Sequence, residues 1–151
     1  MAGASSDGVN AAIATRNEPT RDALLLRNTV REAGALALSL FRTELKNWTK
    51  GASSPVSEAD IAVNELISGR LRSATPHYGW LSEESIDDEQ RLAKKRVWIV
   101  DPIDGTRGYL AGREDWCISV ALVEGTRPVL AAVFAPASDD SSLPSEGAAR
   151  C

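Results

Sequence analysis

The chain has 151 residues, 43% of them hydrophobic, and its 21 acidic and 17 basic residues give a net charge of −4. This length and apolar content predict one domain with a hydrophobic core, and the negative charge argues against a nucleic-acid polymer as partner. No apolar segment is long enough to span a bilayer, and residues 1–19 lack the apolar core of a signal peptide. We therefore expect a cytoplasmic protein with a disordered leader over residues 1–19.

The first predicted element is an amphipathic helix over residues 21–45. Apolar residues recur there every three or four positions, which is typical of one helix face. The members of this face are Leu26, Val30, Ala33, Ala37 and Leu40.

A second helix is predicted over residues 57–74, after a polar stretch at 46–54 that we interpret as loop. Ser57 suits the N-cap and Asp60 follows three residues later, as in a capping box with Asp in place of Glu. Its apolar face contains Val63, Leu66, Ile67 and Leu71, and the Thr75-Pro76 pair ends it.

Short apolar runs then predict strands over residues 78–81, 97–100, 116–123 and 128–134. Residues 124–127 are typical of a hairpin turn, residues 87–96 of a surface loop or short helix, and a short helix is expected from Gly105 or Thr106. Helices that precede strands favour an α+β fold, with two long helices packed on a mostly antiparallel sheet. Residues 138–151 are small, polar and without periodicity, so we expect a disordered tail.

The most informative stretch is Val-Asp-Pro-Ile-Asp-Gly-Thr at residues 100–106. It places two carboxylates, Asp101 and Asp104, at the predicted end of a buried strand. Hard cations such as Mg²⁺ are usually held by a few carboxylates together with phosphate oxygens, so the pattern favours a metal site. Asp-Pro and Asp-Gly are also ordinary turn dipeptides, so these seven residues alone leave a capped turn open.

A second acidic element lies upstream, where Trp80-Leu81-Ser82 leads into Glu83 and Glu84. Two acidic strand ends within one short stretch of chain strengthen the interpretation as a metal site. Neither histidine nor cysteine is placed to suggest zinc, and His77 is interpreted as a surface residue.

Together these segments resemble the first signature of the inositol monophosphatase family, in which Ser-Glu-Glu-Ser precedes Trp-Ile-Val-Asp-Pro-Ile-Asp-Gly-Thr. The segment Ser54-Pro55-Val56-Ser57-Glu58-Ala59-Asp60 also resembles the family's Pro-Val-Thr-x-Ala-Asp element. The resemblance runs from about Arg21 to Ala137 and implies the N-terminal part of a layered α/β sandwich over residues 20–137.

The resemblance implies metal ligands at three carboxylates, Glu83, Asp101 and Asp104, and at the backbone carbonyl of Ile103. Asp101 is then the bridge between two ions. Glu84 stays open as a structural residue, because the family's ligand is the first Glu of the pair.

The resemblance also implies that Asp60 and Thr106 activate the attacking water. For Asp60, a role only as the capping-box acid remains the alternative. Substrate contacts are expected from Glu83 and Asp104, from the amides of Gly105 and Thr106, and from Arg107.

By this resemblance the expected activity is that of a Mg²⁺-dependent phosphomonoesterase with two or three Mg²⁺ ions, inhibited by Li⁺. Arg107 and the aromatic Tyr109 favour a 3'(2'),5'-bisphosphate nucleotidase, which converts 3'-phosphoadenosine 5'-phosphate to AMP and phosphate. An inositol-1-monophosphatase or a histidinol-phosphate phosphatase is the alternative. The expected partner is a small phosphorylated substrate, without nucleic-acid polymer or membrane, and a homodimer is left open.

The family completes its site with an aspartate in a late Trp-Asp-x-Ala segment, which has no counterpart in these 151 residues. We therefore expect an aberrant tail after Ala137 and little or no turnover from the isolated chain. A truncated, non-catalytic remnant of such an enzyme is the competing hypothesis.

Overall fold

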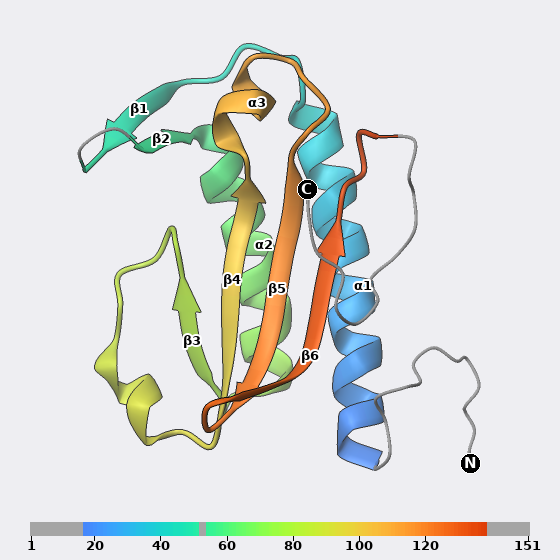
Figure 1. Cartoon of the computed structure of the whole chain (residues 1–151), viewed down its shortest axis with the longest axis vertical. Coiled ribbons are helices and arrows are strands. Elements are labelled where there is room, and N and C mark those ends of the chain that lie inside the picture. The colour runs from blue at the N-terminus through green and yellow to red at the C-terminus, as the bar shows by residue number, and fades with distance from the viewer. Residues whose placement is uncertain (1–16, 52–53, 139–151) are drawn as a thin grey trace.

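The first helix, α1 (Asn17–Leu40), ends five residues earlier than the sequence predicts. The structure is a computed structural model that describes residues 17–51 and 54–138 (Figure 1). Arg42 has a left-handed backbone conformation with φ 64°, which is incompatible with a right-handed α-helix. Its guanidinium donates to the Gly112 carbonyl at 2.8 and 3.0 Å. Residues 17–19 belong to α1, so the expected leader is too long; its remainder lies outside the described residues.

Residues expected to form a loop instead form a two-stranded antiparallel hairpin, β1 (Asn47–Lys50) and β2 (Ser54–Ser57). The β1 sequence Asn-Trp-Thr-Lys has no alternation of apolar and polar residues that would predict a strand, and all four residues are exposed. The register pairs Trp48 with Val56, and Val56 is the buried member of this pair.

Helix α2 (Glu58–Ala74) begins and ends as predicted. The Ser57 hydroxyl accepts from the amides of Ala59 and Asp60, and the Asp60 carboxylate accepts from the Ser57 amide. This reciprocal pair is the predicted capping box, and Thr75 is the C-cap.

The remaining strands form one four-stranded sheet in the order β3-β4-β5-β6. Their bounds are Gly79–Ser82, Arg96–Asp104, Cys117–Glu124 and Arg127–Phe134. β3 pairs parallel to β4 and the other two pairings are antiparallel, which confirms a mostly antiparallel sheet. A 3₁₀ helix, η2 (Glu89–Ala93), lies between β3 and β4, and helix α3 (Thr106–Leu110) follows β4, as predicted.

The hydrophobic core lies between one face of this sheet and the layer formed by α1 and α2 (Figure 1). Every second sheet residue points into it, and the predicted apolar stripes of both helices face it from the other side. The largest fully buried side chains include Trp98, Trp116, Tyr109, Ile67 and Leu71. The α+β fold inferred from the sequence is therefore confirmed.

The opposite face of the sheet is apolar and, among the described residues, no helix covers it (Figure 1). The register aligns Leu81, Ile99, Ala121 and Ala131 in one row across all four strands. Ile99 is 39% exposed and the rest of the row is half-buried. None of the helices in the described part of the chain combines the length and apolar character needed to cross a membrane. Of the predicted disordered tail, residues 138–151, all but the first residue lie outside the described residues.

Candidate active site

A cavity of about 310 Å³ opens where β2, β4, α3 and the loop after β3 meet. Its lining includes six of the site residues inferred from the sequence, namely Glu83, Asp101, Ile103, Gly105, Thr106 and Arg107. Lys50, Ser54, Pro55 and Glu84 complete it. Three separate stretches of the chain, at 50–55, 83–84 and 101–107, therefore converge on one hollow.

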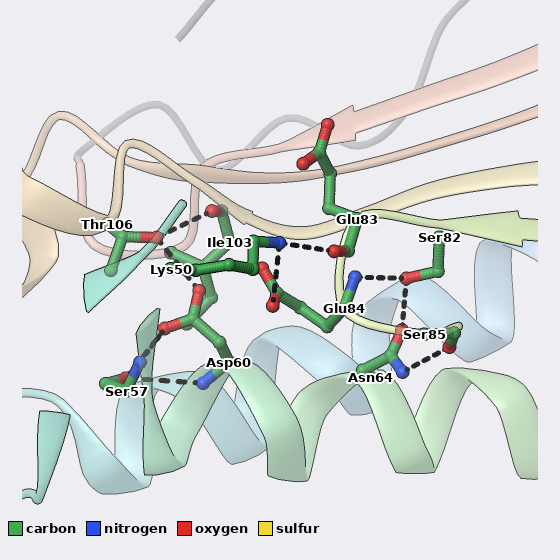
Figure 2. Close-up of polar contacts among 10 residues, drawn as sticks. All are labelled: Lys50, Ser57, Asp60, Asn64, Ser82, Glu83, Glu84, Ser85, Ile103 and Thr106. Atoms are coloured by element: carbon green, nitrogen blue, oxygen red, sulfur yellow. Dashed lines mark hydrogen bonds and ion pairs between the residues drawn. The ribbon is translucent and has the colours of Figure 1, made fainter. Parts of the chain in front are cut away.

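Asp60 and Thr106 are joined beside this cavity by a hydrogen bond from the Thr106 hydroxyl to Asp60 Oδ1 at 2.9 Å (Figure 2). The Ile103 carbonyl lies 3.2 Å from the same hydroxyl, whose single proton serves one acceptor at a time. Asp60 is completely buried, and its Oδ2 accepts from the amide and the hydroxyl of Ser57 at 2.8 and 2.7 Å. The capping box thus holds the carboxylate in place while its other oxygen reaches Thr106.

Asp101 and Asp104 both lie within β4, which runs further than the sequence predicts. Asp101 pairs with Ser119 and Asp104 with Cys117, so three steps on β4 match two on β5. This bulge contains Pro102, which has no N–H to donate to the ladder. Asp101 and Ile103 line the cavity, whereas the exposed Asp104 is not among its lining residues.

Negative charge accumulates around Asp101. Burial, followed by the nearby carboxylates of Asp104, Glu83, Glu84 and Asp60, raises the pKa of Asp101 from 3.8 to about 7. A carboxyl with such a pKa holds a proton until near neutral pH, because ionising it adds a further charge to an already acidic site.

Glu83 and Glu84 follow β3 and present different groups to the site. The Glu83 amide donates to the Val100 carbonyl at 3.1 Å, which fixes the loop beside β4. Figure 2 shows the Glu83 carboxylate pointing away from Lys50, while the Glu84 side chain extends toward it. Lys50 Nζ donates to the Glu83 carbonyl at 2.6 Å and lies 3.4 Å from Glu84 Oε1.

A polar network under this loop comes from α2, and the sequence analysis did not identify it. Asn64 accepts from the Ser82 hydroxyl and donates to Ser85 Oγ at 3.0 Å, and Ser82 Oγ accepts from the Glu84 amide at 3.1 Å (Figure 2). Trp80 Nε1 also donates to Ser85 Oγ at 3.2 Å. A signal existed, because Asn64 is a polar residue one helical turn after Asp60 on the buried face of α2.

The turn into α3 depends on Gly105, which has φ 98°. A Cβ at this position would lie 3.0 Å from the Asp115 carbonyl oxygen and 3.3 Å from Trp116 Cα. Tyr109, which the sequence analysis used to choose between subfamilies, is instead 1% exposed and donates to the Ala37 carbonyl at 2.8 Å. It anchors α3 to α1 and its ring meets Trp116 edge-on.

The chemistry of the donors suits a hard divalent cation, because the cavity combines carboxylates, a carbonyl and surplus negative charge. In this arrangement, however, no three Asp, Glu, His or Cys side chains of the described residues converge closely enough to hold a metal ion together. As they are placed, Glu83, Asp101 and Asp104 therefore do not form a three-carboxylate ligand set.

Comparison with known proteins identifies the family of the chain. A sequence profile of the inositol monophosphatase family matches residues 20–149. The chain is 36% identical to 3'(2'),5'-bisphosphate nucleotidase CysQ of Escherichia coli strain K12 over 102 residues, covering 67% of the chain and 42% of that protein. It is 38% identical to histidinol-phosphatase of Streptomyces coelicolor over 125 residues, 77% of the chain and 45% of that protein.

Among solved structures, extragenic suppressor protein suhB of Bartonella henselae superimposes with a TM-score of 0.72 at 25% identity. The match covers 87% of this chain and 54% of that one. The chain thus spans less than half the length of the two curated relatives named above.

Proposed function

Because this chain belongs to the inositol monophosphatase family, we propose that it carries the metal-binding and water-activating part of a Mg²⁺-dependent phosphomonoesterase. The family and its named relatives are phosphatases. One observation carries the proposal: the Asp60–Thr106 hydrogen bond lies beside an acidic cavity that also contains Asp101 and Arg107.

The metal ligands that we propose are the carboxylates of Glu83, Asp101 and Asp104 and the carbonyl of Ile103. Mg²⁺, when bound by them, would acidify a coordinated water and offset the charge of the phosphate. The raised pKa of Asp101 supports this assignment, since a cation relieves the same repulsion that a proton relieves.

Asp60 and Thr106 position the attacking water in this proposal. The Thr106 hydroxyl donates its hydrogen bond to Asp60, so the lone pairs of the hydroxyl oxygen remain available to accept a hydrogen bond from water. Asp60 is itself fixed by Ser57, which keeps the pair from rotating away. This arrangement orients a nucleophile without a histidine base.

The phosphate would be held by the amides of Gly105 and Thr106 and by the guanidinium of Arg107. Arg107 lines the cavity, and a guanidinium there suits a substrate with a second phosphate. We therefore place 3'-phosphoadenosine 5'-phosphate first, with inositol 1-phosphate and histidinol phosphate as alternatives.

The test is a phosphate-release assay with these three substrates, with and without Mg²⁺ and with Li⁺. We expect slow release that requires Mg²⁺, is greatest with 3'-phosphoadenosine 5'-phosphate, and is abolished by Asp104→Asn. Glu65→Gln, an exposed acid on α2, is the matched control and retains activity.

The competing hypothesis of a non-catalytic remnant has a specific observation in its favour, because the described carboxylates do not converge as placed. A folded chain that binds Mg²⁺ in calorimetry, yet releases no phosphate from any of the three substrates, would establish the remnant and reject the phosphatase.

A further inference from the structure

We propose that Trp48 is a stacking platform for a nucleobase, so that the acidic cavity accepts a nucleoside bisphosphate in preference to an inositol phosphate. The inference rests on the proposed function, because the phosphate that is removed must lie in that cavity. It adds a residue that contacts the remote part of the substrate and selects its chemical class.

The cavity itself offers charged and polar groups to a phosphate but no aromatic surface to a base. Among the described residues that line it, only Pro55 and Ile103 have apolar side chains, and none is aromatic. Aromatic side chains are the usual platforms for nucleobases, because every base has a π face. The base of a nucleotide therefore needs a surface outside the cavity.

Trp48 lies two positions before Lys50, a residue that lines the cavity. Successive side chains of a strand alternate in direction, so Trp48 and Lys50 share one side of the hairpin, about 7 Å apart along β1. The register assigns their partners, Val56 and Ser54, to the same side, and Ser54 also lines the cavity. The indole is therefore on the side of the hairpin that carries the cavity, one residue pair away from it.

Trp48 is also the one tryptophan, tyrosine or phenylalanine of the described residues that is classed as exposed. Its exposed fraction is 47%, whereas Trp80, Trp98 and Trp116 are exposed by 7% or less. Ile86, two positions after Glu84, is 95% exposed but has no π system with which to stack. Trp48 thus combines accessible aromatic surface with proximity to the cavity.

The base of the hairpin keeps this surface in place. Val56, the cross-strand partner of Trp48, is 2% exposed. The Lys46 amide donates to Glu58 Oε1 at 2.9 Å, and the Glu58 amide donates to the Lys46 carbonyl at 3.0 Å. A platform that is already ordered loses little conformational entropy when a base stacks on it. An inositol ring is saturated and covered with hydroxyl groups, so it gains no stacking.

The experiment compares wild type with Trp48→Leu, which keeps an apolar side chain without a ring, and with Trp48→Phe, which restores a ring. Thr49→Ala is the matched control, since Thr49 is an exposed β1 residue that points to the opposite side of the strand. Each protein is titrated by calorimetry, with MgCl₂ present, against 3'-phosphoadenosine 5'-phosphate and against inositol 1-phosphate.

Trp48→Leu should weaken the binding of 3'-phosphoadenosine 5'-phosphate by about five- to 150-fold, the range expected for the loss of one base–aromatic stack. Its affinity for inositol 1-phosphate should equal that of wild type. Trp48→Phe should recover most of the lost affinity, and Thr49→Ala should match wild type with both ligands.

Tryptophan fluorescence gives a second readout that needs no catalysis. We expect 3'-phosphoadenosine 5'-phosphate at saturation to quench the emission of wild type and of Thr49→Ala, and inositol 1-phosphate to leave it unchanged. The signal reports on Trp48, because the other three tryptophans are buried.

The outcomes separate this inference from the proposed function. Equal losses of affinity for both ligands in Trp48→Leu, an unchanged affinity for 3'-phosphoadenosine 5'-phosphate, or no quenching in wild type overturns the inference. Phosphate release that is indifferent to Trp48→Leu with every substrate rejects the inference and leaves the phosphatase standing. Ring-dependent binding without release of phosphate supports the inference and rejects only the proposed function.

Discussion

At the scale of single residues, the site is dominated by repulsion between carboxylates. Asp101 is the residue most affected, because it is half-buried and surrounded by four other acids. A proton, an ammonium or a metal ion can each relieve this repulsion. Its energetic consequence is measurable in the metal-free protein.

We predict that the metal-free protein loses stability as pH rises from about 4 to about 7. Unfolded Asp101 ionises near its ordinary pKa of 3.8, whereas folded Asp101 keeps its proton until about 7. Unfolding in this window releases a proton, so the free energy of unfolding falls as pH rises. The stability that depends on protonated Asp101 is fully present below about pH 4 and is lost by the time the pH has passed the folded pKa of about 7.

Urea unfolding in EDTA at several pH values measures this effect. Asp101→Asn should flatten the pH dependence in that window and be more stable than wild type above pH 7. Glu65→Gln, on the exposed face of α2, should keep the wild-type slope. A wild-type slope in Asp101→Asn contradicts the prediction.

At the scale of elements, two local structures aim the site residues. The turn from β4 into α3 requires the left-handed Gly105, and the loop after β3 rests on the Asn64 network of α2. Each can be tested by a substitution that leaves the proposed metal ligands in place.

Gly105→Ala should destabilise the protein by about 1–3 kcal/mol, because it forces a side chain into a left-handed conformation and against the Asp115 carbonyl. Gly69→Ala is the opposing control. Gly69 lies inside α2 with open space around its Cβ position, so alanine should stabilise by about 0.4–1 kcal/mol. Thermal unfolding of both variants measures these changes. Melting temperatures that shift in the same direction would contradict the different roles assigned to the two glycines.

Asn64→Ala should cost about 1–3 kcal/mol, because it leaves the buried Ser82 hydroxyl without its acceptor and Ser85 without its amide donor. Hydrogen exchange should also show weaker protection of the Glu84 amide, which donates a hydrogen bond to the Ser82 hydroxyl. Glu65→Ala, the next residue on the exposed side of α2, is the control. Unchanged Glu84 protection would mean that the network does not hold the loop.

At the scale of the whole molecule, the sheet has two apolar faces of unequal burial. One packs against α1 and α2, and the other has no covering helix among the described residues (Figure 1). The strand register assigns each residue to a face, so matched substitutions distinguish them.

Val120→Thr should cost about 1–3 kcal/mol, since Val120 is 1% exposed on the helix-facing side and threonine buries a hydroxyl there. Val133→Thr, at a half-buried position that pairs with Ser119 on the open face, should change stability by less than about 0.5 kcal/mol. Urea unfolding of both variants measures the difference in stability cost between the two faces of the sheet. Comparable losses would show that the open face is covered in solution.

Several elements follow from local sequence. The Ser57–Asp60 capping box, the apolar stripes of α1 and α2 and the hairpin turn at Gly125 depend on neighbours within a few positions, and all are confirmed. The end of α1 and the β1–β2 hairpin were missed, because Arg42 bonds to Gly112, seventy positions away, and β1 has no buried face.

The sequence by itself determined α2, the strands of the four-stranded sheet, the α+β class and the family, because periodicity, caps and short motifs are local properties. Only the tertiary structure decided which oxygens face one another: that Thr106 meets Asp60, that Lys50 reaches Glu83 and Glu84, and that Asn64 supports their loop. Such contacts join residues 18 to 46 positions apart, and their geometry depends on how helices, strands and loops pack. No local pattern encodes that packing.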